Sequence, residues 1–336
     1  MTDNNTLLSV RDLVVEYTSE GRIIHAVNGV SLNIKKGETL GLVGETGAGK
    51  TTIAKSILRI LSIPPAKIAG GEIFYQGEDI LKMSEPEVRK IRGEQISMIF
   101  QDPMTALNPT MRVGEQIADV LETHRKMSRK EAWDEAARIL ETVGISSDRI
   151  REYPHQFSGG MKQRVVIAIA LACDPELLLA DEPTTALDVT IQAQVLELIG
   201  QLKKDRQMAL LLITHDLGIV AENCDNVAVI YAGEIVEYGT LEDVFVRTAH
   251  PYTMGLFDSL PDISKDTKHL KPIQGQPPDP SDLPQGCSFN PRCPYATEEC
   301  RSGNVEKIQL SDTHMCACRN YDKILNGKEN EDGSVG

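Results

Sequence analysis

The stretch from Gly44 to Thr52, with the sequence GETGAGKTT, constrains the fold of this chain more than any other. It matches the pattern G-x-x-x-x-G-K-[ST] at every position. A short apolar run at 39–43 predicts a buried strand before it, and a helical pattern over 52–60 follows. Glycines let the backbone bend so that its N–H groups converge on a phosphate, and the helix N-terminus adds a favourable dipole. The stretch therefore predicts a nucleotide-binding P-loop.

Individual positions of the P-loop have different expected roles. The ammonium of Lys50 is expected at the β- and γ-phosphates, and the hydroxyl of Thr51 on Mg²⁺. The other predicted nucleotide contacts in the loop are Gly44, Glu45, Thr46, Gly47, Ala48, Gly49 and Thr52. Tyr17, at the end of an expected strand over 7–17, is either an edge-strand aromatic or a ring that stacks on adenine.

Two carboxylates follow a buried apolar strand expected over 176–181. Such strands rarely end in paired acids unless a cation is present. Asp181 is expected to hold Mg²⁺, directly or through water, and Glu182 to act as the general base toward an attacking water molecule.

Other expected strands also end in polar residues. Gln101 follows a strand over 96–100 and is a Mg²⁺ ligand, a residue that positions water, or a surface amide. His215 follows a buried strand over 210–214, and ligands of open α/β sheets bind at such strand ends. Two further strands, over 227–231 and 234–238, are predicted to form a hairpin.

A helix is predicted to begin at Ser158, which is a good N-cap residue. Gly159 and Gly160 leave the first N–H groups exposed, so the segment is either a plain capped helix or a second phosphate-binding surface. Helical periodicity also extends over 112–143, and the apolar run 165–173 predicts a buried helix.

The formal charge of −14 and the pI near 5.0 argue against nucleic acid as the main partner. The longest clean apolar run, 165–173, is far shorter than the roughly 20 residues that span a bilayer. The N-terminus lacks a signal-peptide pattern. We therefore expect a soluble, cytosolic chain whose membrane role depends on partner subunits.

Together these motifs resemble the ATP-binding subunit of an ABC transporter. The resemblance implies an α/β P-loop NTPase core with a β-rich subdomain and an inserted helical subdomain at about 102–165. The corresponding motifs are Walker A at 44–51, the Q-loop at Gln101, the signature from Ser158 to Gln163, Walker B at 177–181, the catalytic Glu182, the D-loop Ala186-Leu187-Asp188 and the switch His215. The signature residues Ser158, Gly159, Gly160 and Gln163 are thereby implied to contact nucleotide.

A narrower resemblance is carried by FQDPMTALNP at 100–109, by HPYT at 250–253 and by SLP at 259–261. These segments are similar to the dipeptide, oligopeptide and nickel importers, and the match is best to the D-type ATPase subunit of the peptide permeases. It implies an ATPase domain over 1–245 and a C-terminal extension over 246–336. Within the extension, 261–286 is rich in proline and polar residues and is expected to be an irregular linker.

The resemblance implies a set of partners. Two ATPase subunits would pair head to tail, the second being a related but different chain, with each nucleotide between Walker A of one and the signature of the other. Two transmembrane permease subunits would bind near Gln101, at the cytoplasmic face of the membrane, and a solute-binding protein would deliver the peptide. Alternatives are import of nickel or another small solute, a soluble ABC protein acting on DNA or ribosomes, or a metal-storage or redox module.

Five of the seven cysteines lie within 287–318, and Cys173 and Cys224 are expected to be inert core thiols. Disulfides are not expected in a reducing cytosol. Zinc favours closer ligand pairs, whereas a cluster accepts irregular spacing. Similar tails of peptide-permease ATPases imply a [4Fe–4S] cluster held by Cys287, Cys293, Cys300 and Cys318. Cys316 departs from that pattern, and zinc or metal-free packing thiols remain open.

Overall fold

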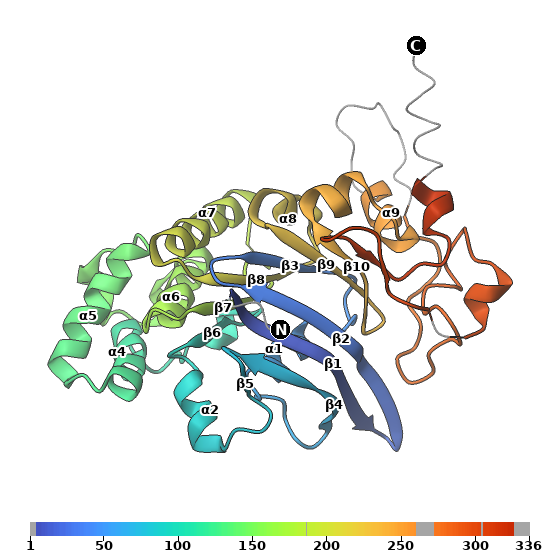
Figure 1. The fold of residues 1–336 in the computed structure, drawn as a ribbon. Helices are drawn as coiled ribbons and strands as arrows, with labels where there is room; N and C mark the ends of the chain where they lie inside the picture. The colour runs from blue at the N-terminus through green and yellow to red at the C-terminus, as the bar shows by residue number, and fades with distance from the viewer. Residues whose placement is uncertain (1–4, 186, 260–271, 304, 326–336) are drawn as a thin grey trace, which may run out of the picture.

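The computed structural model describes residues 5–185, 187–259, 272–303 and 305–325. Its frame consists of two sheets (Figure 1). The larger has eight strands in the order β11-β12-β10-β9-β3-β8-β7-β6, and the smaller is an antiparallel sheet in the order β2-β1-β4-β5. This mixed α/β architecture confirms the expected P-loop NTPase fold class.

Five strands of the larger sheet run parallel. They are β3 (Thr39–Val43), β6 (Ile96–Ile99), β7 (Leu177–Asp181), β8 (Ala209–Thr214) and β9 (Asn226–Tyr231). Every residue of β3, β7 and β8 is buried. Nearly continuous apolar strands are typical of parallel sheets that are covered on both faces.

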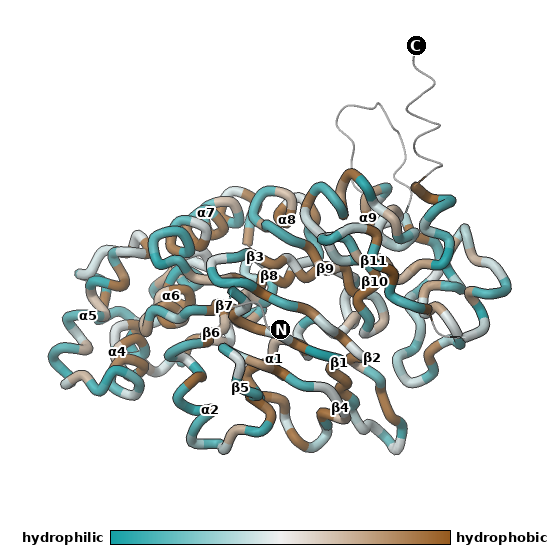
Figure 2. The backbone as a smooth tube through the Cα atoms, in the orientation of Figure 1, coloured by the Kyte–Doolittle hydropathy of each residue, from teal (hydrophilic) through white to brown (hydrophobic). Residues whose placement is uncertain are grey.

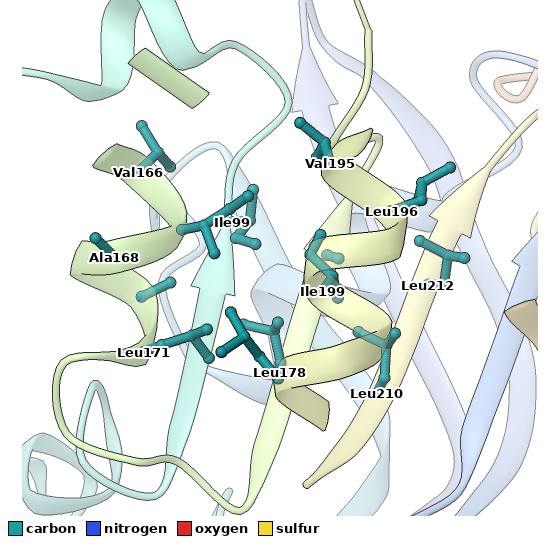
Figure 3. Packing of buried hydrophobic residues seen from close by; sticks show 14 of the residues in the cluster. Ile99, Val166, Ala168, Leu171, Leu178, Val195, Leu196, Ile199, Leu210 and Leu212 are labelled. Carbon is teal, nitrogen blue, oxygen red and sulfur yellow. The ribbon is translucent and has the colours of Figure 1, made fainter. Parts of the chain in front are cut away.

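Alternate side chains of these strands enter two different hydrophobic cores. Leu178 and Leu210 pack against helices α6 (Gly159–Leu171) and α7 (Val189–Arg206), as Figure 3 shows. Leu177 and Leu179 point to the other core, which contains α1 (Lys50–Ile57) and the antiparallel sheet. The helix α8 (Leu217–Asn223) lies with α6 and α7. Figure 2 shows hydrophobic stretches of the chain around β7 and α6.

The smaller sheet consists of three long strands and one short strand. Its members are β1 (Thr6–Ser19), β2 (Arg22–Lys35), β4 (Ala66–Tyr75) and β5 (Glu78–Asp79), followed by helix α2 (Glu85–Ile91). The buried residues of β1 and β4 include Leu13 and Ile73, which pack over the core that holds α1. This sheet is the expected β-rich subdomain.

The helical pattern expected over 112–143 corresponds to two helices. They are α4 (Val113–Arg125) and α5 (Arg129–Thr142), preceded by α3 (Pro103–Ala106). The break occurs because Lys126 adopts a left-handed backbone with φ of 53° and Ser128 caps α5 by accepting a bond from the Glu131 N–H. Short 3₁₀ turns at Ser147–Arg151 and Pro154–Gln156 connect α5 to α6.

The C-terminal part of the chain packs onto the larger sheet. β10 (Glu234–Thr240) forms the predicted hairpin with β9, and β12 (Met315–Cys316) pairs with β10 and with β11 (Ile308–Gln309). After the single-turn π-helix Glu242–Val246 come α9 (Pro251–Asp258) and a 3₁₀ turn at Glu298–Arg301. Phe289 is buried in the main core beside α9, so the C-terminal part shares its interior with the larger sheet and helices α6 and α7.

Two further points concern the expected linker and the membrane. Residues 272–286 contain no helix or strand. Residues 260–271, which include Leu260 and Pro261 of the SLP motif, lie outside the described part of the chain. Within the described part of the chain, no helix is long and apolar enough to cross a membrane.

Candidate active site

The P-loop connects β3 to α1 in a conformation that requires glycine. Gly49, the N-cap of α1, has φ of +101°, and a Cβ there would lie 2.3 Å from the carbonyl oxygen of Ala26. A Cβ on Gly44 would lie 2.2 Å from the carbonyl oxygen of Ile230. Both contacts are with rigid backbone, so the loop curls tightly against β2 and β9 and leaves its N–H groups at the start of a helix.

Lys50 is folded back over its own loop. Its Nζ donates to the carbonyl oxygens of Gly44, at 2.7 Å, and Glu45, at 3.0 Å, and the side chain is buried. Burial lowers the pKa of Lys50, and the nearby carboxylates of Glu182 and Asp181 oppose that change. The ammonium is thus held at the mouth of the loop, where an anion can replace the two carbonyl groups.

The P-loop helix and the end of β7 meet at one hydrogen bond. Thr51 Oγ1 donates to Asp181 Oδ1 at 3.1 Å. Burial raises the pKa of Asp181, and the bond from Thr51 counteracts this. A hydroxyl and a carboxylate are hard oxygen donors of the kind that Mg²⁺ prefers, so these two residues fit the expected magnesium site.

Glu182 lies at the centre of the predicted catalytic residues. Its Oε2 accepts bonds from Gln101 Nε2 at 3.1 Å and Thr185 Oγ1 at 2.9 Å, and its Oε1 lies 3.5 Å from His215 Nδ1. Burial alone would raise the pKa of Glu182, but the Thr185 bond and the adjacent His215 outweigh it, so the pKa falls below its usual value. The backbone of Glu182 has a left-handed φ of 47°, which is uncommon for a residue other than glycine.

Tyr17 also reaches the P-loop. Its hydroxyl lies 3.3 Å from Thr52 Oγ1 in α1, although it comes from the far end of β1. The structure therefore places this ring beside the helix that begins at the P-loop. Tyr17 joins the same site as Lys50 and Thr51.

The signature segment lies apart from the P-loop of its own chain. Ser158 caps α6 by accepting a bond from the Met161 N–H at 3.4 Å. Within the described residues, no hydrogen bond joins Ser158, Gly159 or Gly160 to residues 44–52. A Cβ on Gly160 would lie 2.7 Å from Ile191 Cγ2, so glycine lets α7 approach α6 closely at this point.

Gln163 and the D-loop support the residues around Glu182. Gln163 is fully buried, and its Nε2 donates to the carbonyl oxygen of Pro183 at 2.6 Å, so it holds the loop after Glu182. Asp188 caps α7 through the Ile191 N–H at 3.0 Å. Of the predicted D-loop residues, Ala186 lies outside the described part of the chain.

Two residues of the C-terminal extension contact the P-loop and were not identified from the sequence. The guanidinium of Arg292 makes two bonds to the carboxylate of Glu45, and the hydroxyl of Tyr252 accepts a bond from the Glu45 N–H at 3.0 Å. Tyr252 belongs to the HPYT motif, which is the only sequence signal that bears on these contacts. No local pattern relates residues 45 and 292.

The prediction of a [4Fe–4S] cluster is wrong. Within the described residues, no group of three or more His, Cys, Asp or Glu side chains could hold a metal ion. The four proposed ligands line a cavity of about 20 Å³, which has room for about one water molecule. They are Cys287, Cys293, Cys300 and Cys318.

These cysteine thiols lie in a largely buried environment. Burial raises the pKa of Cys293 to about 11 and that of Cys318 to about 12, and it also raises the pKa of Cys287. In the metal-free chain these groups are therefore neutral thiols in an apolar setting. They pack as small hydrophobic residues, as do the fully buried Cys173 and Cys316. Cys224 is also buried, and burial raises its pKa to about 12.

Comparison with known families and proteins agrees with this geometry. The family described as "ABC transporter" matches residues 27–185, and "Oligopeptide/dipeptide transporter, C-terminal region" matches residues 236–300. The dipeptide transport ATP-binding protein DppD of Bacillus subtilis is 48% identical over 314 residues, which cover 93% of this chain and 94% of that protein. The oligopeptide transport ATP-binding protein OppD of Escherichia coli is 48% identical over 300 residues, covering 89% and 88%.

Solved structures are similar as well. A dimeric, post-hydrolysis state of the ATP-binding cassette MJ0796 bound to ADP and Pi has a TM-score of 0.63 at 28% identity, covering 70% of this chain and 98% of that one. The structure of cbiO1 from Clostridium perfringens, part of the ABC transporter complex cbiONQ, has a TM-score of 0.62 at 29% identity, covering 72% and 91%. The chain is thus similar to ATP-binding cassettes in both sequence and fold.

Proposed function

The chain belongs to the ABC transporter ATPases of the oligopeptide and dipeptide transport family, and on that basis we propose that it hydrolyses ATP to drive peptide import. The observation that carries this proposal is the position of Glu182. Its carboxylate contacts Gln101 and His215 and directly follows Asp181, the partner of Thr51. A base, a cation site and a P-loop thereby converge at one edge of a parallel sheet.

ATP would occupy the P-loop with its phosphates at the N-terminus of α1. Lys50 would exchange its bonds to the Gly44 and Glu45 carbonyl oxygens for the β- and γ-phosphates. Thr51, Asp181 and Gln101 would hold Mg²⁺, which neutralises charge on the phosphates.

Glu182 would act as the general base. Because its pKa is lowered, its carboxylate is ionised at neutral pH and can accept a proton from the attacking water molecule. His215 and Gln101 keep the carboxylate oriented through both of its oxygens. Gln101 and His215 follow β6 and β8, the two strands that flank β7, so a small shift of either residue would change the position of the base.

ABC ATPases of this family work as dimers with membrane permease subunits. We propose that Ser158, Gly159 and Gly160 complete the nucleotide site of the partner ATPase, whereas Gln163, which was expected to contact nucleotide, is buried and would hold the loop after Glu182. The exposed Ser158 cap, which has no hydrogen bond to 44–52 among the described residues, supports this arrangement. A related but different ATPase chain as the partner, and a solute-binding protein outside the cell, belong to the same proposal.

We propose a matching division of the chain. Residues 1–245 form the nucleotide-binding domain, with its helical subdomain at about 102–165, and 246–336 form the C-terminal extension. Peripheral attachment to the cytoplasmic face of the membrane would then occur through permease subunits that contact the region of Gln101 and α3 to α5.

Transport in proteoliposomes tests the proposed function. The chain is reconstituted with its permease subunits and second ATPase, with ATP enclosed in the lumen, and labelled di- and oligopeptides are added outside with the solute-binding protein. We expect peptide to accumulate only when ATP is inside. Equal accumulation with and without ATP, or with the Lys50→Ala variant, would contradict an ATP-driven importer.

A further inference from the structure

Arg292 of the C-terminal extension is bound directly to the nucleotide-binding loop. Its Nη1 and Nη2 lie 2.9 and 3.0 Å from Glu45 Oε2 and Oε1, which is the paired geometry of a strong arginine–carboxylate bridge. The Arg292 side chain is only 5% exposed and that of Glu45 is 26% exposed. The pair is therefore largely shielded from water and from salt.

All of the guanidinium is committed. Its Nε donates to the carbonyl oxygen of Gln274 at 3.1 Å, and Nη1 also lies 3.3 Å from the hydroxyl of Tyr231. Nη2 lies 3.5 Å from the carbonyl oxygen of Ile273. Arg292 thus joins three segments, which are residues 273–274, the end of β9 and the P-loop.

A second contact holds the backbone at the same position. The Glu45 N–H donates to Tyr252, whose ring packs against Tyr231 with centroids 4.6 Å apart. Tyr252 is itself fixed, because its N–H donates to the buried His250, whose own N–H bonds the buried carboxylate of Glu237. Glu45 is therefore held at both its amide and its side chain by residues outside the ATPase motifs.

We propose that Arg292 and Tyr252 are positioning residues that set the conformation of the P-loop for nucleotide binding through Glu45. The proposal rests on the ATP site described above. Glu45 is the first residue after Gly44 in the P-loop, and its carbonyl oxygen accepts the bond from Lys50 Nζ. A loop fixed at this residue loses less conformational freedom when nucleotide binds, so the extension raises nucleotide affinity by preorganisation.

A purely structural ion pair predicts a different outcome. In that case loss of Arg292 would loosen the extension and lower the melting temperature, while nucleotide affinity of the folded protein would stay the same. Positioning predicts a loss of affinity that depends on Glu45. The two cases are separated by measuring binding and unfolding on the same variants.

The experiment uses the full chain and a fluorescent ADP analogue with Mg²⁺. Binding to the wild type establishes the nucleotide site independently of the new proposal. We expect Arg292→Gln to weaken nucleotide binding about tenfold. Arg292→Lys keeps one charged contact, so its affinity should lie between those of the wild type and Arg292→Gln. The matched control is Arg301→Gln, a 60% exposed arginine of the same segment, which should bind like the wild type.

A double-mutant cycle assigns the effect to the P-loop. With Glu45→Gln in place, Arg292→Gln should cause little additional loss, because the contact is already broken. Unchanged affinity in the single Arg292→Gln variant, or an equal loss in both backgrounds, would overturn the proposal.

If Arg292→Gln does not fold, a second variant still tests the proposal. Tyr252→Phe keeps the ring and its packing but removes the acceptor of the Glu45 N–H, so it should bind nucleotide more weakly with little change in melting temperature. Wild-type affinity in both Tyr252→Phe and Glu45→Gln would overturn the role of these contacts.

Discussion

Nδ1 of His215 lies 3.5 Å from Oε1 of Glu182, and the two side chains extend from the ends of adjacent parallel strands. The register of β7 and β8 fixes this distance, since Asp181 pairs with Ile213. Hydrolytic chemistry therefore depends on sheet geometry as much as on residue type.

Replacing Tyr17 with alanine should weaken nucleotide binding. The ring lies beside α1, and loss of a base-stacking aromatic typically costs about 1–3 kcal/mol. Tyr17→Phe keeps the ring and removes only the contact with Thr52 Oγ1, so it should bind nearly as well as the wild type. Titration with fluorescent ADP compares the three proteins, and an alanine variant with unchanged affinity would exclude stacking.

The isolated chain should hydrolyse ATP slowly. Its Ser158 segment is exposed and, among the described residues, makes no hydrogen bond to residues 44–52, so on the proposed arrangement another ATPase subunit completes the site. Phosphate release is measured for the purified chain and for the assembled transporter, with light scattering to establish the oligomeric state. A confirmed monomer that hydrolyses ATP as fast as the transporter would contradict the shared site.

His250 should make stability fall with acid. Burial lowers its pKa from 6.5 to about 3, so the unfolded chain binds a proton between these values and the folded chain does not. Stability contributed by neutral His250 is complete above pH 6.5 and is lost as the pH falls, by about 1.4 kcal/mol per unit.

The His250→Asn variant isolates this effect. Asparagine can still accept the bond from the Tyr252 N–H at the start of α9 but does not titrate. Chemical denaturation at several pH values between about 4 and 6 should give a shallower pH dependence for the variant. Identical slopes for the two proteins would show that His250 does not titrate as described.

The motifs at strand ends could be predicted from sequence because each lies within a few residues of a recognisable apolar strand. Asp181, Glu182 and His215 needed only the rule that ligands bind at the carboxyl ends of parallel strands. The pairing of Arg292 with Glu45 could not be predicted, since it joins residues 247 positions apart with no local pattern at either end. Such contacts follow from how the extension packs, which periodicity does not report.

For the cysteine segment, the sequence predicted a metal site that the described residues do not form. Spacing suggested ligands, but spacing does not reveal the space between the thiols or their protonation. In the structure Cys293 and Cys318 adjoin a cavity of about 20 Å³, and burial raises the pKa of both. Likewise, the break between α4 and α5 required the left-handed backbone of Lys126, which a helical pattern conceals.

The most direct test of the account is ATP turnover by Glu182→Gln in the assembled transporter. The amide preserves the shape of the side chain but cannot accept a proton from water. The matched control is Glu197→Gln, an exposed residue on α7. We predict that Glu182→Gln keeps nucleotide binding while its rate of phosphate release falls by about 10²- to 10⁴-fold, whereas the control hydrolyses ATP normally. Wild-type turnover by Glu182→Gln would contradict the assignment of Glu182 as the general base.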